Sequence, residues 1–260
     1  MRLLLILGFL GFFSSSQAQE YTVIQIIGKI YNTETNTYLK SGSKINEETT
    51  LKFETPTARA AVLSTVKGRY IVQKTTKNSY SNDLIYALSA VISPIKGKLS
   101  TRSGSINNQM DFIKKFGEQR TVWIGDSYKT VVSAIAYPMD DTHFFYVSYE
   151  YNNETINKRL YSSGDTLVFD YSTFYAVDEV PIDPSTTTDL YLYYYNTTST
   201  ESIKLTSLNF KILSEDELEE IIESVSGFTK IERNKVLLEV ITSLYGSCSE
   251  DEINAVLGNE

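Results

Sequence analysis

The last 47 residues of the chain repeat one helix-starting pattern three times, and this repetition constrains the fold more than any other feature. Ser214, Thr229 and Ser249 are each followed, three residues later, by a glutamate. A hydroxyl at the N-cap and a carboxylate at the third helical position bind free N–H groups of the first turn reciprocally. Apolar residues then recur with the i, i+3, i+4, i+7 spacing of one helical face. Glycine follows each run, where it commonly ends a helix, at Gly227, Gly246 and Gly258. Residues 214–260 are therefore predicted to form an acidic three-helix tail.

Residues 121–213 have the period of strands. Runs of β-branched and aromatic residues alternate with Asp, Asn, Gly and Pro, which favour turns. Leu192 and Tyr194 alternate with Tyr191, Tyr193 and Tyr195 along the sequence. The two sets are therefore expected on opposite faces of the sheet. An antiparallel, Tyr-rich β-sandwich of the Ig-like type is the prediction. Its strands are expected at 131–136, 144–151, 156–161, 166–171, 190–195 and 203–210.

Residues 19–120 are predicted to form a basic β-module with one or two short helices. Short strands are expected at 21–30, 51–53, 60–63 and 70–72, with breaks at glycine and proline. Ser81 or Asn82 could cap a helix through residues 84–92 that ends before Pro94. A second short helix is expected to end at Gly117. The whole chain is thus expected to be mainly β with a C-terminal α-helical segment.

Residues 1–18 resemble a signal peptide. Arg2 precedes eleven apolar or glycine residues, and Ser16-Gln17-Ala18 matches a peptidase site, so cleavage is expected after Ala18. Eleven residues span only about 16 Å as a helix, short of the roughly 30 Å of a bilayer core. We expect an exported protein, periplasmic, on the cell surface or secreted, with no transmembrane segment in the mature chain.

The net charge of −8 hides an internal separation. Residues 21–120 hold 15 Lys and Arg against 7 Asp and Glu, a net charge of +8. Residues 121–213 carry −7 and residues 214–260 carry −9. Opposite charges predict either docking within one chain or self-association between copies. Nucleic acid is not expected as a partner of an acidic exported protein.

The inventory of catalytic groups is poor. His143 is the single histidine and Cys248 the single cysteine, which leaves too few residues for a usual zinc site or a histidine-based triad. Acidic turns offer oxygen ligands for calcium but lack EF-hand spacing. No catalytic residue, metal site or cofactor is predicted. A carboxylate pair of the kind used for glycoside hydrolysis stays open, because any two of the 32 acidic residues could approach in a fold.

Two groups of side chains are candidate binding surfaces. The first would present cations to an anionic cell-surface polymer or an acidic protein face. The second would stack aromatic rings on sugars or peptides. The basic group comprises Lys67, Arg69, Lys96, Lys98 and Arg102, and the aromatic group comprises Tyr191, Tyr193 and Tyr195.

The N-terminal module resembles the short β-repeat of FecR-like extracytoplasmic domains. The resemblance lies in Gly28-Lys29-Ile30, Leu39, Gly42, Ile45, Leu51 and Ala61-Val62-Leu63. The chain as a whole is similar in style to exported proteins of Bacteroidota. This resemblance implies a Gram-negative envelope location and a role in sensing or assembly.

We therefore predict a binding, adaptor or scaffold module for an envelope protein or cell-surface polymer. One alternative is a hydrolase that cleaves envelope glycans with a carboxylate pair. Another is a carbohydrate-binding or adhesin module, which requires a row of exposed tyrosines on one sheet face.

Overall fold

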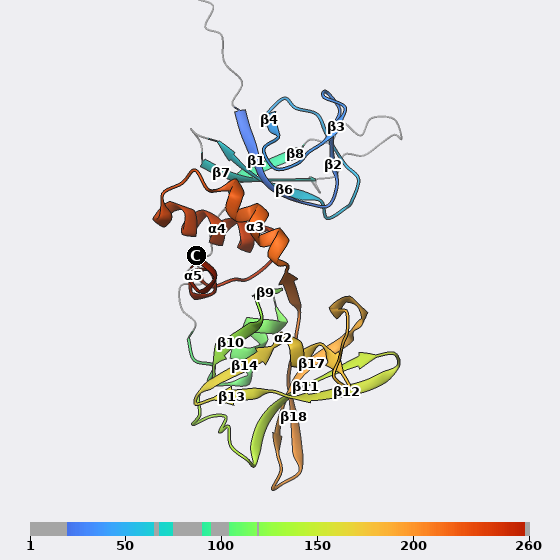
Figure 1. Cartoon of the computed structure of the whole chain (residues 1–260), viewed down its shortest axis with the longest axis vertical. Helices are drawn as coiled ribbons and strands as arrows, with labels where there is room; N and C mark the ends of the chain where they lie inside the picture. Colours follow the sequence, from blue (N-terminus) through green and yellow to red (C-terminus); the bar gives the residue numbers. More distant parts are fainter. Residues whose placement is uncertain (1–19, 65–67, 75–89, 95–103, 119, 258–260) are drawn as a thin grey trace, which may run out of the picture.

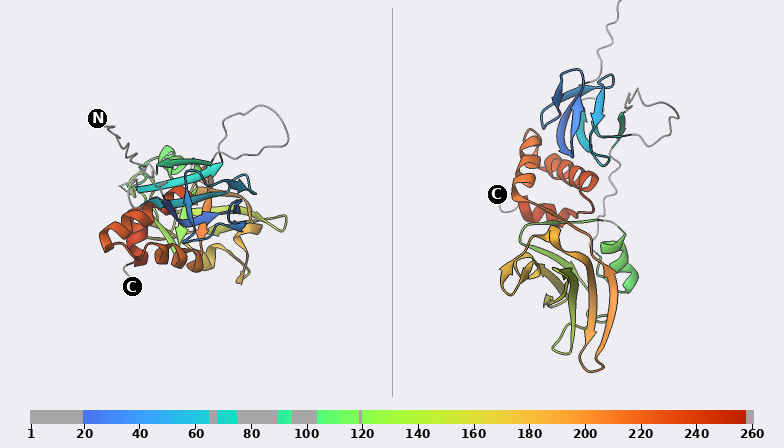
Figure 2. Two further views of the ribbon diagram at one scale, coloured as in Figure 1. Left: turned by 90° about the horizontal axis from the view of Figure 1, so that it is seen from above. Right: turned by 90° about the vertical axis from the view of Figure 1, so that its right-hand side faces the viewer.

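A computed structural model describes residues 20–64, 68–74, 90–94, 104–118 and 120–257. The chain is mainly β, with several antiparallel sheets and C-terminal helices, as the sequence predicted. Although the helices come last in the sequence, they lie between the N-terminal β-module and the β-sandwich (Figures 1 and 2). This order gives the molecule three layers along its long axis.

The N-terminal module contains two antiparallel sheets. The larger has the order β4-β1-β6-β7-β8, and the smaller the order β3-β2-β5. The turn after β1 needs glycine, because Gly28 has a φ of +76° and a Cβ there would collide with Thr55. The strands are β1 Glu20–Ile27, β2 Ile30–Asn32, β3 Thr37–Tyr38, β4 Lys44–Asn46, β5 Leu51–Phe53, β6 Arg59–Ser64, β7 Gly68–Lys74 and β8 Ala90–Pro94.

One predicted helix in this module is wrong over the part that the structure describes. Ala90–Pro94 is strand β8, which pairs antiparallel with β7, and residues 75–89 lie outside the described residues. Pairing along the edge of β7 overrides the helical spacing, and the β-branched pair Val91-Ile92 suits a strand. The second short helix is confirmed: α1 Gln109–Phe112 continues into the π-helical turn η1 Ile113–Gly117.

The sandwich places a four-stranded sheet, β12-β11-β17-β18, against the three-stranded sheet β10-β14-β13. The predicted strand at 131–136 is misplaced: β10 ends at Val131, and a turn in which Tyr137 N–H donates to Ser133 leaves Ile135 97% exposed. The elements are β10 Ser127–Val131, β11 His143–Tyr151, β12 Glu154–Arg159, β13 Tyr161–Ser163, β14 Thr166–Asp170, α2 Tyr171–Phe174, β15 Ala176–Val177, β16 Val180–Pro181, η2 Pro184–Thr186, β17 Thr188–Asn196 and β18 Glu201–Ser207.

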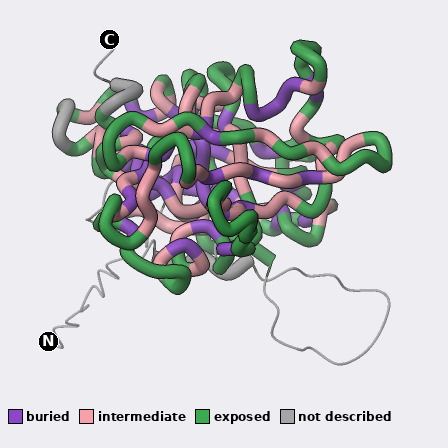
Figure 3. Tube along the Cα trace, turned by 90° about the horizontal axis from the view of Figure 1, so that it is seen from below, coloured by how far each residue is buried: buried purple, intermediate pink, exposed green. Residues whose placement is uncertain are grey.

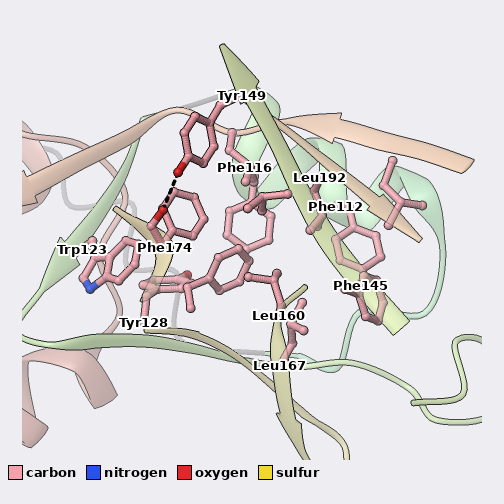
Figure 4. Close-up of a cluster of buried hydrophobic side chains, with 14 of the residues drawn as sticks. Phe112, Phe116, Trp123, Tyr128, Phe145, Tyr149, Leu160, Leu167, Phe174 and Leu192 are labelled. Atoms are coloured by element: carbon pink, nitrogen blue, oxygen red, sulfur yellow. Dashed lines mark hydrogen bonds between the residues drawn. The ribbon is translucent and has the colours of Figure 1, made fainter. Parts of the chain in front are cut away.

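The core of the sandwich is mostly aromatic (Figure 4). Trp123 lies at one end of it, and α1 and η1 contribute Phe112 and Phe116. Strand β9 Thr121–Ile124 pairs in parallel with β19 Phe210–Leu213, a departure from the purely antiparallel prediction. The strands by which the chain enters and leaves the sandwich therefore lie side by side.

The helices are α3 Glu215–Ser224, α4 Lys230–Leu244 and α5 Glu250–Leu257, and all three predicted capping boxes form. Their apolar faces share one core with Ile24 and Ala61 of the module and with Val122 and Leu213 of the sandwich. Gly246 has a φ of +143°, and a Cβ there would collide with the Arg120 carbonyl. The loop between α4 and α5 therefore docks closely on the start of β9.

Buried positions lie toward the interior of the molecule, in strands and helices, and exposed ones lie mostly at loops (Figure 3). Within the described part of the chain, none of the helices has the length and apolar character needed to cross a membrane.

Candidate binding face on the four-stranded sheet

The outer face of the four-stranded sheet carries the predicted tyrosines. Leu192 and Tyr194 point into the core, whereas Tyr191, Tyr193 and Tyr195 are only half-buried. The period of two in β17 produces this division, as the sequence indicated. A carbohydrate-binding surface of the predicted kind requires exposed tyrosines, and these three lie on one sheet face but are only partly exposed.

Strand pairing adds two aromatic residues that sequence reasoning did not include. Phe144 of β11 lies opposite Tyr195, and Tyr146 lies opposite Tyr193. The rings of Tyr146 and Tyr193 stack with centroids 5.0 Å apart and planes 9° from parallel. Those of Phe144 and Tyr195 lie 5.3 Å apart at 54°. With Tyr191, these four rings form one aromatic strip across two neighbouring strands, here called the aromatic face.

Cations from the outer strands lie at both ends of the aromatic face. The guanidinium of Arg159 on β12 lies 4.3 Å from the centroid of the Phe144 ring. The ammonium of Lys204 on β18 lies 3.0 Å from the centroid of the Tyr191 ring. Such contacts stabilise both partners electrostatically. The hydroxyl groups of Tyr146 and Ser202 share a hydrogen bond of 2.7 Å. The face therefore combines apolar ring surfaces with hydrogen-bonding groups at its margin.

Arg69 is the member of the predicted basic group that the structure describes. Lys67, Lys96, Lys98 and Arg102 lie outside the described residues. Arg69 on β7 forms an ion pair with Glu239 of α4. The helices separate the module from the sandwich (Figure 2), so Arg69 and the aromatic face lie in different layers. Arg69 serves to dock the module on the helices.

His143 belongs to a turn that begins β11. Its Nδ1 lies 3.1 Å from Oδ1 of Asp140, and the same oxygen accepts hydrogen bonds from the hydroxyl and N–H of Thr142 and the N–H of His143. These bonds, with that of the Thr142 hydroxyl first, lower the pKa of Asp140 to about 2. The arrangement closes a turn around a carboxylate that stays ionised.

Thr142→Val is expected to raise the pKa of Asp140 from about 2 toward its usual value, because the hydroxyl bond favours the charged form. Carboxyl carbon NMR between pH 1.5 and 6 measures this midpoint. In the wild-type protein the turn contributes stability that is present above the ordinary carboxyl pKa and is lost as the pH falls toward 2. An unchanged midpoint in Thr142→Val would refute the assignment, and Thr155→Val, on the neighbouring strand, is the control.

Cys248 is a buried thiol. Burial, with Glu252 as the second cause, raises its pKa far above the usual range. A reactive thiolate requires the opposite shift. The cysteine therefore has the properties of a core residue in the loop before α5.

A cleft of about 840 Å³ separates β10 from α3 and α5. Five carboxylates line it, from Asp126, Glu215, Glu219, Asp251 and Glu252. Glu252 accepts the N–H of Ser249 at 2.6 Å and so belongs to a capping box. Among the residues described by the structure, no group of three His, Cys, Asp or Glu side chains is placed to hold a metal ion. If the protein were a hydrolase with a carboxylate pair, this acidic cleft would hold the pair.

The aromatic face is the better-built site of the two. It has paired rings and cations in contact with them, all on neighbouring strands of one sheet. The chain matches no model of a known protein family, and no curated protein matches it.

Proposed function

We propose that the protein is an exported, non-enzymatic binding module of the cell envelope that holds a surface glycan on its aromatic face. The stacked pair Tyr146 and Tyr193 is the observation that carries this proposal. Sugar rings present apolar C–H faces that pack on aromatic rings, while their hydroxyls need polar partners at the margin. Arg159, Lys204 and Ser202 supply such partners.

The extent of the aromatic face across two strands favours an extended polymer over a small molecule. Small ligands are usually held in concave pockets that bury most of their surface. The aromatic face instead extends across two neighbouring strands, β11 and β17. Several sugars of one chain could occupy it together, each adding a modest contribution. A protein partner is the alternative occupant of the same face.

The signal-like residues 1–18 support an envelope location, as does the resemblance of the N-terminal module to FecR-like domains. Surface glycans are abundant in that compartment. The module would then serve as an adaptor that displays the sandwich away from its own attachment partner. The helices between them make this a rigid display, because they share a core with both.

Tyr193→Ala and Tyr146→Ala are each expected to weaken glycan binding at least tenfold, about 1.4 kcal/mol, because each removes one ring of the stacked pair. Affinity electrophoresis in gels containing soluble β-glucan, xylan, mannan or α-glucan identifies the retained polymer, and calorimetry gives its affinity. Tyr193→Phe keeps the ring and should keep most of the affinity.

Tyr161→Ala is the matched control, because Tyr161 is 67% exposed but lies on β13 of the other sheet. It should bind like the wild-type protein. Retention of no polymer, or equal losses in Tyr161→Ala and Tyr193→Ala, would contradict the proposal. If the wild-type protein instead releases reducing ends from the retained polymer and this activity is lost in Glu219→Gln, the result would favour a hydrolase whose carboxylates lie in the acidic cleft.

A further inference from the structure

A second cleft lies where all three layers meet. It encloses about 870 Å³ between the end of the β6–β7 pair, the C-terminal end of α4 and the residue before β9. Three cations line it, Arg59, Lys74 and Arg120, and none of the described residues that line it is acidic. Hydroxyl and amide groups of Thr57, Thr242 and Asn209 complete the wall. We call it the junction cleft.

The charged form of Arg59 is disfavoured by its surroundings in this cleft. Burial lowers its pKa, and the like charge of Arg120 lowers it further. One guanidinium nitrogen donates to the carbonyl of Leu244 at the end of α4, where the helix dipole favours a cation. Its Nε is buried and has no hydrogen-bond partner among the described residues. Arg59 therefore retains a donor that the fold does not satisfy.

Arg120 is fixed by its backbone and not by an ion pair. Its carbonyl accepts the N–H of Ser247, in the close approach that requires glycine at position 246. Its side chain is exposed, and within the described residues neither Arg120 nor Arg59 forms an ion pair. Two arginines with no counter-ion among the described residues thus line one cleft, from the start of β6 and from the residue before β9, beside the C-terminal end of α4.

We propose that the junction cleft binds a dianionic oxyanion, either inorganic phosphate or the phosphoryl group of a phosphate ester, between Arg59 and Arg120. A guanidinium donates two parallel N–H bonds to phosphate oxygens, and two guanidiniums match two negative charges. The anion offsets the repulsion between the two arginines. Because the cleft is built from all three layers, the bound anion stabilises their docking.

The test uses the full mature chain at pH 7.5 and constant ionic strength. Inorganic phosphate is expected to raise the midpoint of thermal unfolding relative to chloride, because a ligand of the folded state stabilises it by mass action. Arg120→Gln should weaken phosphate binding at least tenfold in calorimetry and remove most of the thermal shift. Because Arg120 is exposed, this variant is expected to fold.

Lys52→Gln removes the same charge from an exposed position on β5, outside the junction cleft, and should behave like the wild-type protein. A parallel titration with glycerol 3-phosphate distinguishes the sources: tighter binding of the ester assigns the site to phosphorylated compounds, and tighter binding of inorganic phosphate assigns it to the free ion. No binding of either probe, or equal loss in Lys52→Gln and Arg120→Gln, would overturn the proposal.

Discussion

Replacing Trp123 with alanine is expected to lower the free energy of unfolding by about 4 kcal/mol, a large part of the stability of an ordinary domain. The indole is fully buried, and its ring centroid lies 5.2–6.5 Å from the centroids of six other aromatic rings. Its removal leaves a cavity beside the parallel pair of β9 and β19, which joins the sandwich to the helices. Urea unfolding followed by circular dichroism measures the change.

Trp123→Phe is the informative partner of this variant. The indole Nε1 is buried and has no acceptor among the described residues, so the wild-type protein already carries an unsatisfied donor. Phenylalanine removes that donor and keeps most of the ring. Its cost should stay below about 2 kcal/mol. If Trp123→Phe is as destabilising as Trp123→Ala, the indole N–H has an acceptor, and this description of the core is wrong.

Arg69→Met is expected to lower the free energy of unfolding by about 3 kcal/mol. Arg69 pairs with Glu239, whose side chain is only 9% exposed, so the substitution leaves a buried carboxylate without its counter-ion. The pair joins β7 of the basic module to α4 of the acidic tail. One cation of the basic N-terminal segment thus pairs with one carboxylate of the acidic C-terminal segment.

The double variant Arg69→Met with Glu239→Leu should recover most of this loss, because an apolar pair of similar volume replaces both charges. Lys44→Met is the surface control: Lys44 and Glu20 are paired, but their side chains are 64% and 58% exposed, and the cost should stay under about 1 kcal/mol. Equal effects of Arg69→Met and Lys44→Met in urea unfolding would mean that the buried pair does not hold the layers together.

Local chemistry made part of this fold predictable. The three capping boxes depend on residues three apart, and all three form. The alternation in β17 likewise depends only on neighbours, and it placed Tyr191, Tyr193 and Tyr195 on one face. Features of this kind need no knowledge of which elements meet.

Long-range pairing could not be predicted in the same way. The register that sets Phe144 against Tyr195 joins residues far apart in the chain, as does the parallel pair of β9 and β19. The spacing of residues 84–92 predicted a helix, but Ala90–Pro94 forms a strand because it pairs with the edge of β7. The placement of Arg59 beside Arg120 depends on the helices lying between the other two layers, which no local pattern indicates.

The most direct test of the glycan-binding proposal is an NMR titration of protein carrying ¹³C-labelled tyrosine with an oligosaccharide of the retained polymer. Ring signals of Tyr146 and Tyr193 should shift together with one dissociation constant, because these rings stack at the centre of the aromatic face. Those of Tyr161, on the other sheet, should stay in place. Shifts at Tyr128, beside the acidic cleft, with none at Tyr146 and Tyr193, would contradict the proposal.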